Sequence, residues 1–157
     1  MKMNFEKSPV LKKLFVNYGV PMNRALGMKL KTCDDDAIEL FMKRKKKNTN
    51  YGGTIHGSAI MALAETAHGV SVLNRIGAFS NLMVSKNIEL DFVKKATGDL
   101  MVRFELDKNK GDWIDRQLKE NGKCEVEFES VVTDKAGDIV AKLTANYHIR
   151  RSKRGDR

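Results

Sequence analysis

The stretch NYGGTIHGSAIMALAETAHGVSVLNRI, residues 50–76, decides how the rest of this chain folds. A glycine-rich turn leads into His56, and almost every position that follows is apolar. A helix that is apolar on all sides is normally buried. This one is too short and too interrupted by polar residues to cross a bilayer. The sequence therefore predicts one long central helix inside a soluble core.

A single carboxylate, that of Glu65, lies inside this apolar run. Burial of an unpaired charge costs so much free energy that such a group is normally paired, protonated or functional. Glu65 is therefore the leading candidate for a catalytic residue. The alternative is a structural role, in which Glu65 forms a salt bridge with Arg75 or a hydrogen bond with His68.

The length and composition indicate one globular domain that spans residues 1–157. The chain is long enough for a real core and too short for two ordinary domains. Hydrophobic residues make up 41% and charged residues 31%, which is typical of a folded protein. No signal peptide or membrane span is recognisable, so we expect a cytoplasmic protein without membrane insertion. Cys33 and Cys124 are far apart and outside any CxxC motif, which predicts ordinary thiols.

The formal net charge of +9 favours a polyanionic partner, such as nucleic acid, acidic lipid or a phosphate-bearing cofactor. Much of the excess lies in the run KRKKK, residues 43–47, and in the tail RRSKR, residues 150–154. An exposed loop and a frayed, flexible tail over residues 151–157 would explain the two runs equally well. The charge alone leaves these readings open.

Alternating apolar and polar residues predict a sheet on either side of the central helix. A first hairpin is expected at 28–33 and 37–43, joined by a turn at the three aspartates 34–36. Further strands are expected at 82–93, 100–106, 124–129 and 139–149, the last two around a turn at 134–138. This order of elements predicts an α+β fold in which an antiparallel sheet wraps one helix.

Three further segments precede or connect these elements. Residues 10–18 have helical spacing, with Ser8 as the N-cap, Pro9 in the first turn and Gly19 as the stop, so a short helix is expected over residues 8–18. Residues 21–27 are expected to form a link, because Pro21 and Gly27 punctuate them. Residues 111–122 are expected to form a loop with one helical turn.

The residues around the central helix resemble a known family, the hotdog-fold acyl-CoA thioesterases, in particular the phenylacetate-pathway and 4-hydroxybenzoyl-CoA thioesterases. That group has Asn or Gln, then Gly-x-x-His-Gly-Gly, and about two turns later Asp or Glu followed by Thr or Asn. The resemblance covers roughly residues 28–149 and extends to Val84-Ser85 and the run 88–99. The matching residues here are Asn50, Gly53, His56, Gly57, Glu65 and Thr66. Two departures are Ser58 in place of the second glycine and Lys95 in place of a proline.

The resemblance implies hydrolysis of an acyl-CoA or a related acyl thioester. Glu65 would act as general base on water, or as a nucleophile that forms an anhydride, and apolar surroundings would strengthen it as a base. The Gly57 N–H, at the start of a helix, would polarise the thioester carbonyl, although a glycine there also lets helix and sheet pack closely. Asn50 would hold the water or the carbonyl, or serve only as a turn residue. Ser85 matches the position of a hydroxyl that steadies the water.

The remaining matched residues are expected to bind or support the substrate. His56 has a structural role by the resemblance and is expected to bond the loop before it, while Thr66 belongs to the matched motif. The Ser58 hydroxyl is able to compete for the backbone donors at the helix start. Lys45, Lys46 and Lys47 are expected to meet the phosphates of CoA.

The reaction implied by the resemblance requires no metal and no redox cofactor, with CoA present only as part of the substrate. A metal site made by His56, Glu65 and His68 is not expected, because the two histidines lie about three helical turns apart. His68 and His148 are expected to be ordinary residues.

The resemblance also implies a homodimer, often doubled into a tetramer. Gly57 and Glu65 are eight residues apart, about 12 Å along a helix, so one carbonyl cannot contact both in one chain. Antiparallel central helices of two subunits would complete each site. No nucleic acid partner is expected. The alternatives are a hotdog hydratase or dehydratase and a non-catalytic acyl-CoA-binding module.

Overall fold

A curved sheet of six antiparallel strands frames the protein, whose computed structural model describes residues 8–34 and 37–153. The strand order is β1-β2-β4-β5-β6-β3. The six predicted strands are confirmed, with β5 beginning and ending beyond its expected bounds. They are β1 (Met28–Cys33), β2 (Ala37–Met42), β3 (Asn81–Phe92), β4 (Leu100–Glu105), β5 (Lys123–Asp134) and β6 (Ile139–Arg151).

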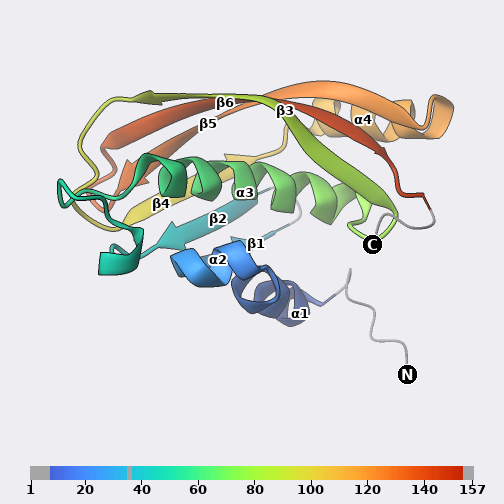
Figure 1. Ribbon diagram of the computed structural model, residues 1–157. Helices are drawn as coiled ribbons and strands as arrows, with labels where there is room; N and C mark the ends of the chain where they lie inside the picture. The colour runs from blue at the N-terminus through green and yellow to red at the C-terminus, as the bar shows by residue number, and fades with distance from the viewer. Residues whose placement is uncertain (1–7, 35–36, 154–157) are drawn as a thin grey trace.

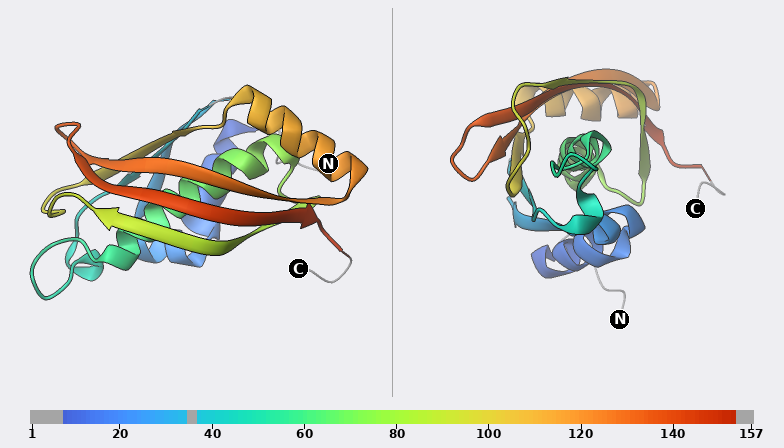
Figure 2. Two further views of the ribbon diagram at one scale, coloured as in Figure 1. Left: turned by 90° about the horizontal axis from the view of Figure 1, so that it is seen from above. Right: turned by 60° about the vertical axis from the view of Figure 1, so that its left-hand side comes forward.

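The sheet wraps around the long helix α3 (Gly57–Ile76), so the predicted hotdog fold is confirmed (Figure 1). The end-on view in Figure 2 shows the sheet on three sides of α3 and the N-terminal helices along the fourth side. The face of α3 toward the sheet is buried and forms the centre of the core. Its buried residues are Ala59, Ile60, Leu63, Ala64, Ala67, His68, Ser71 and Val72.

The opposite face of α3 is only half-buried, which corrects the expectation of a helix buried on all sides. Met61, Glu65, Thr66 and Val70 lie on this face and keep part of their surface exposed. The reason is that the sheet reaches around three sides only, and the N-terminal helices cover the fourth side incompletely. The apolar residues of this face line a cavity rather than a solid core.

The N-terminal segment forms two short helices instead of one helix and a link. α1 (Pro9–Leu14) continues through a π-helical turn (Phe15–Gly19), and α2 (Pro21–Leu26) follows. Ser8 caps α1 as predicted, since its side chain accepts from the Leu11 N–H. The predicted link was wrong because Pro21 occupies the first turn of a new helix, a position that suits proline as well as a helix end does.

Two buried asparagines attach this N-terminal segment to the sheet and to α3. The Asn17 side chain accepts a hydrogen bond from the Leu30 N–H of β1 at 2.6 Å. Asn23 donates to the Val16 carbonyl at 3.0 Å and accepts from the Thr66 hydroxyl of α3 at 3.4 Å. These bonds fix α1 and α2 against the open face of α3.

The segment predicted as a loop forms a helix, α4 (Lys108–Glu120). Asp107 caps it by accepting from the Lys110 N–H at 2.9 Å. The apolar spacing was present in the sequence, because Ile114 and Leu118 are four residues apart and are both buried. The prediction failed because most other positions are polar, as expected for a helix with only one face on the core.

The strand β6 takes in the start of the basic run at residues 150–154. Arg150 and Arg151 end β6 and pair with Lys123 and Asn81, so the flexible tail expected over residues 151–157 was wrong at Arg151. The predicted tail beyond Lys153, and Asp35 and Asp36 of the predicted turn, lie outside the described residues. Within residues 8–34 and 37–153, no helix is both long enough and apolar enough to span a membrane.

Candidate active site

Glu65 is held by a serine on the neighbouring strand β3. The Ser85 hydroxyl donates a hydrogen bond to Glu65 Oε1 at 2.8 Å. Neither structural partner proposed for Glu65 takes part. His68 contacts the Tyr147 hydroxyl through Nδ1 at 2.9 Å, and Arg75 pairs with Asp112 and Asp115 of α4. Glu65 is thus a partly exposed carboxylate fixed by one neutral donor.

A β-bulge turns Ser85 toward Glu65. The β3–β6 register pairs Ser85 with Tyr147 and Asn87 with Asn146, which leaves Lys86 as an extra residue. Strict alternation from Ile88 would place Ser85 on the outer face of the sheet. The extra residue reverses this parity, so Ser85 lies on the same face as Ile88 and beside α3.

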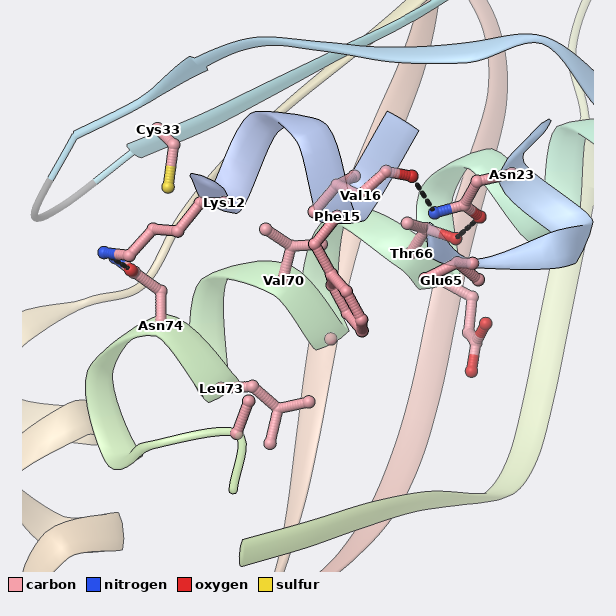
Figure 3. Close-up of a pocket in the computed structure, with 13 residues that line it drawn as sticks. Lys12, Phe15, Val16, Asn23, Cys33, Glu65, Thr66, Val70, Leu73 and Asn74 are labelled. Carbon is pink, nitrogen blue, oxygen red and sulfur yellow. Dashed lines mark hydrogen bonds between the residues drawn. The ribbon is translucent and has the colours of Figure 1, made fainter. Parts of the chain in front are cut away.

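Glu65 opens into an apolar cavity of about 220 Å³ between α3 and the N-terminal helices (Figure 3). The floor is the half-buried face of α3, and the roof comes from α1 and the π-helical turn. The principal apolar lining residues are Phe15, Val16, Val20, Val70 and Leu73. An apolar hollow with a carboxylate at one end suits an acyl group whose reacting carbon lies beside that carboxylate.

A second hollow, of about 810 Å³, lies at the start of α3. It is lined by Asn50, His56 and Gly57, together with Phe92 and Lys95. The predicted site residues therefore fall into two groups within one chain. Glu65, Thr66 and Ser85 lie at the first cavity, and Asn50, His56 and Gly57 lie at the second, about 12 Å away along the helix axis.

His56 caps α3 with its side chain. Its Nδ1 accepts from the Ser58 N–H at 3.2 Å and lies 2.8 Å from the Ser58 hydroxyl. The expected hydrogen bond between His56 and the loop before it is present, although the side chain is used for the cap. The backbone makes that contact instead, since the His56 N–H donates to the Asn48 carbonyl at 2.9 Å. The Ser58 N–H and hydroxyl are both engaged by His56 as a result.

Gly57 combines a donor with a close packing contact. Its N–H is at the first helical position and has no acceptor among the described residues. A Cβ atom at Gly57 would lie 2.7 Å from Cζ of Phe92, so the glycine also lets β3 approach the helix. The close packing expected at this glycine is therefore present, and the role of its N–H toward a substrate carbonyl stays a prediction.

Asn50 shapes the loop that precedes the helix. Its side chain donates to the Thr54 hydroxyl at 2.9 Å and accepts from the Thr54 N–H at 3.2 Å. The turn interpretation of Asn50 is therefore correct, and these bonds occupy both ends of its amide. The residue still lines the second hollow.

The three lysines expected to bind phosphate are exposed. A short 3-10 turn (Lys46–Asn48) contains Lys46 and Lys47, with Lys45 directly before it, and it precedes the loop of Asn50. Buried Asn48 anchors the turn by donating to the Lys43 carbonyl at 2.9 Å and accepting from the Lys45 N–H at 2.8 Å. The turn is fixed, and its three ammonium groups are left at the surface.

His68 is a feature that sequence reasoning missed. Its ring is fully buried, with its centroid 4.5 Å from that of Phe104 and 5.7 Å from those of Phe128 and Tyr147. Burial lowers the pKa of His68 from its ordinary value of 6.5 to about 4, so the ring is neutral near neutral pH. Burial, and after it the charge of Glu65, raises the pKa of Tyr147. The sequence signal was the position of His68 one turn after Glu65 on an apolar helix.

His56, Glu65 and His68 each contact a different side chain. His56 bonds Ser58, Glu65 bonds Ser85 and His68 bonds Tyr147. Within residues 8–34 and 37–153, no three His, Cys, Asp or Glu side chains are grouped closely enough to hold a metal ion.

Solved structures with the same fold are numerous. A Pseudomonas aeruginosa protein, described as of unknown function and a "Probable Thioesterase", is 24% identical with a TM-score of 0.84, covering 92% of this chain and 97% of that chain. A Chlorobaculum tepidum protein of unknown function is 16% identical with a TM-score of 0.80, covering 90% and 93%. A mutant of a Staphylococcus aureus thioesterase is 16% identical with a TM-score of 0.68, covering 83% and 99%.

At these identities the structural likeness shows the fold alone. The chain matches no curated protein. One family does match, and its match covers residues 10–149, which include every element from α1 to most of β6. The chain therefore belongs to the family described as a domain of unknown function, DUF4442.

Proposed function

We propose that this protein hydrolyses acyl thioesters, with an acyl-CoA as the substrate and Glu65 as the catalytic carboxylate. The observation that carries the proposal is the Glu65–Ser85 hydrogen bond at the end of an apolar cavity. The cavity receives the acyl chain, and the thioester carbonyl lies beside Glu65. Glu65 takes a proton from water, and the water oxygen bonds to the carbonyl carbon. Collapse of the tetrahedral intermediate breaks the carbon–sulfur bond, and the protonated Glu65 returns the proton to the leaving thiolate. The products are the free acid and CoA.

The oxyanion of that intermediate requires a donor that Glu65 and Ser85 do not provide. Gly57 offers an N–H at a helix start, where the dipole favours negative charge. In one chain this N–H is about 12 Å along the helix from Glu65, so we assign the role to Gly57 of the partner subunit in a homodimer. The sheet ends at β3, and Ser85 and Glu65 lie at that edge. A two-fold partner that pairs there, with its α3 antiparallel, would complete the site.

The same arrangement gives the lysine turn a role. The hollow at the start of α3 lies at the same end of the molecule as the turn that carries Lys45, Lys46 and Lys47 (Figure 1). In the dimer they receive the CoA moiety of a substrate whose acyl chain occupies the partner's apolar cavity. A cluster of exposed ammonium groups attracts phosphate groups. Dissolved salt screens these charges and weakens the attraction.

A hydratase is less well supported by the residues of the two cavities. Such an enzyme needs a histidine paired with an acid at the substrate, but His68 contacts Tyr147 instead of a carboxylate. Among the described residues, His148 lies 3.7 Å from Glu125, yet neither lines either cavity. The carboxylate without a histidine partner favours hydrolysis.

Substitution of Glu65 tests the proposal. We expect Glu65→Gln to keep the fold and substrate binding and to lower kcat on acyl-CoAs by about two to four orders of magnitude, the range for loss of a general base. Glu120→Gln, at the exposed end of α4, is the matched control and is expected to keep full activity. Turnover of Glu65→Gln within about threefold of wild type would exclude the proposed mechanism. Binding of acyl-CoAs without any turnover by the wild-type protein would favour a non-catalytic binding module.

A further inference from the structure

The end of the apolar cavity opposite Glu65 carries a lysine. Lys12 of α1 and Asn74 of α3 both line the cavity, and the Lys12 ammonium donates a hydrogen bond to the Asn74 side-chain carbonyl. Figure 3 shows this pair at one side of the cavity and Glu65 at the other, with Val70 and Leu73 between them. The cavity is therefore apolar along its length and polar at both ends.

The charge of Lys12 is not neutralised by this contact. Lys12 is half-buried, and no carboxylate of the described chain lies within 4.0 Å of its ammonium nitrogen. Its neutral amide partner uses one of three ammonium donors, and the Asn74 nitrogen remains as a further donor.

The spacing of the two polar ends suits a chain of limited length. Glu65 and Asn74 are nine residues apart, which is about 13 Å along the axis of α3. At about 100° per residue they lie on opposite edges of a helix face whose midline holds Thr66 and Leu73. The cavity thus crosses the helix diagonally and has room for an extended medium-length alkyl chain.

We propose that the preferred substrate is a medium-chain acyl thioester whose acyl chain ends in a carboxylate, that is, a monothioester of an α,ω-dicarboxylic acid. The proposal rests on the proposed function, because it places the thioester carbonyl at Glu65. The distal carboxylate accepts hydrogen bonds from the Lys12 ammonium and the Asn74 amide. A plain alkyl chain of equal length would cover the ammonium without supplying an acceptor, which is unfavourable.

Hydrolysis of matched substrates tests this preference. Each monothioester from hexanedioyl-CoA to dodecanedioyl-CoA is compared with the alkanoyl-CoA of the same carbon number. At the best-fitting length, we expect kcat/KM to be about ten- to a hundredfold higher for the dicarboxylic ester, as for a hydrogen bond to a charged group. Lys12→Met removes the charge but keeps most of the length of the side chain, and it is expected to reduce this ratio to about threefold or less. Lys13→Met, the exposed neighbour, is expected to retain it.

A binding measurement separates this inference from the proposed function. Calorimetry with the Glu65→Gln variant compares the same two thioesters without turnover, and we expect tighter binding of the dicarboxylic ester by a similar factor. Asn74→Asp would pair Lys12 with a carboxylate and is expected to abolish the preference even if Lys12→Met fails to fold. Equal binding of both esters, or a preference unchanged by Lys12→Met or Asn74→Asp, would overturn the inference. Preferential binding without wild-type turnover would instead overturn the hydrolase proposal alone.

Discussion

The Ser85 hydroxyl lies 2.8 Å from Glu65 Oε1, although strict alternation along β3 would point Ser85 away from α3. The bulge at Lys86 creates this contact. β-Bulges occur frequently beside active sites, where they redirect a side chain. In this chain the bulge gives Glu65, the proposed catalytic carboxylate, its one direct side-chain partner within the described residues.

Loss of that hydroxyl should affect turnover more than stability. In Ser85→Ala, Glu65 keeps its position on α3 but loses the donor that orients it. We expect kcat to fall about tenfold, with the free energy of unfolding changed by about 1 kcal/mol or less, the usual net value of one exposed hydrogen bond. Steady-state kinetics and urea unfolding measure the two effects. A large loss of stability with unchanged kcat would assign Ser85 to the fold only.

Gly69 sets the width of the apolar cavity beside Glu65. It lines the cavity, and a Cβ atom there meets nothing within 4 Å. Gly69→Ala should therefore raise stability by about 0.5–1 kcal/mol through helix propensity. Gly69→Leu should fill the cavity and lower kcat/KM for medium-chain esters by about tenfold or more, while acetyl-CoA is hydrolysed as before. If Gly69→Leu changes kcat/KM for medium-chain esters and for acetyl-CoA by the same factor, the acyl group does not occupy this cavity.

His68 should make the protein less stable in mild acid. Its pKa is about 4 in the folded chain, while an unfolded histidine binds a proton near its ordinary value of 6.5. Below that ordinary value only the unfolded state takes up the proton, so stability falls as the pH decreases from 6.5 toward 4. The full loss is about 3 kcal/mol, of which most is reached by about pH 5.

Urea unfolding at about pH 7 and about pH 5 measures this loss in a range above the usual pKa of most carboxyl groups. His68→Gln keeps a polar group beside Tyr147 but does not titrate, so its stability should change much less between the two conditions. An equal loss of stability in both proteins would assign the acid sensitivity to other groups.

Neutralising the lysine turn should weaken the binding of CoA esters. The triple change of Lys45, Lys46 and Lys47 to glutamine is expected to raise KM and to flatten its dependence on salt, because screening acts on exposed charges. A control with the same loss of charge replaces Lys119, Lys123 and Lys142, which are exposed elsewhere. An unchanged KM at low salt would show that the turn is only a solvated loop.

The sequence predicted those parts of the fold that depend on local patterns. The apolar run of α3 and the alternation around Leu90 and Val126 are periodic signals that any buried face imposes. The Glu65–Ser85 contact also lay within reach, because a family resemblance aligned both residues. The reversal of parity at Lys86 was hidden, since a bulge depends on pairing with β6, which is distant in sequence.

The helices α1 and α2, which cover the half-buried face of α3, could not be predicted from the sequence for a different reason. Pro21 can end one helix or begin another, and only the packing of Asn17 and Asn23 decides between them. The cavity itself depends on this packing, because Lys12 reaches Asn74 only when α1 lies across α3. The sequence alone therefore could not predict the Lys12–Asn74 end of the apolar cavity.

The proposed shared active site depends on the Gly57 N–H, which a substitution by proline removes. Gly57 is the first residue of α3, where proline is tolerated, and His56 has ψ near 137°, as the residue before a proline prefers. Gly57→Ala places a similar Cβ against Phe92 but keeps the N–H. We expect Gly57→Pro to lower kcat by about two to three orders of magnitude relative to Gly57→Ala, the range for one oxyanion donor.

The most direct test combines Glu65→Gln with Gly57→Pro in one dimer. If Glu65 of one subunit works with Gly57 of the partner subunit, a mixed dimer has one site with both defects and one intact site. Random co-refolding of the two nearly inactive variants should then restore about a quarter of wild-type activity, because about half of the dimers are mixed and each has one working site. Native mass spectrometry would count the mixed dimers. Activity no higher than that of the parents, with mixed dimers present, would contradict the shared site.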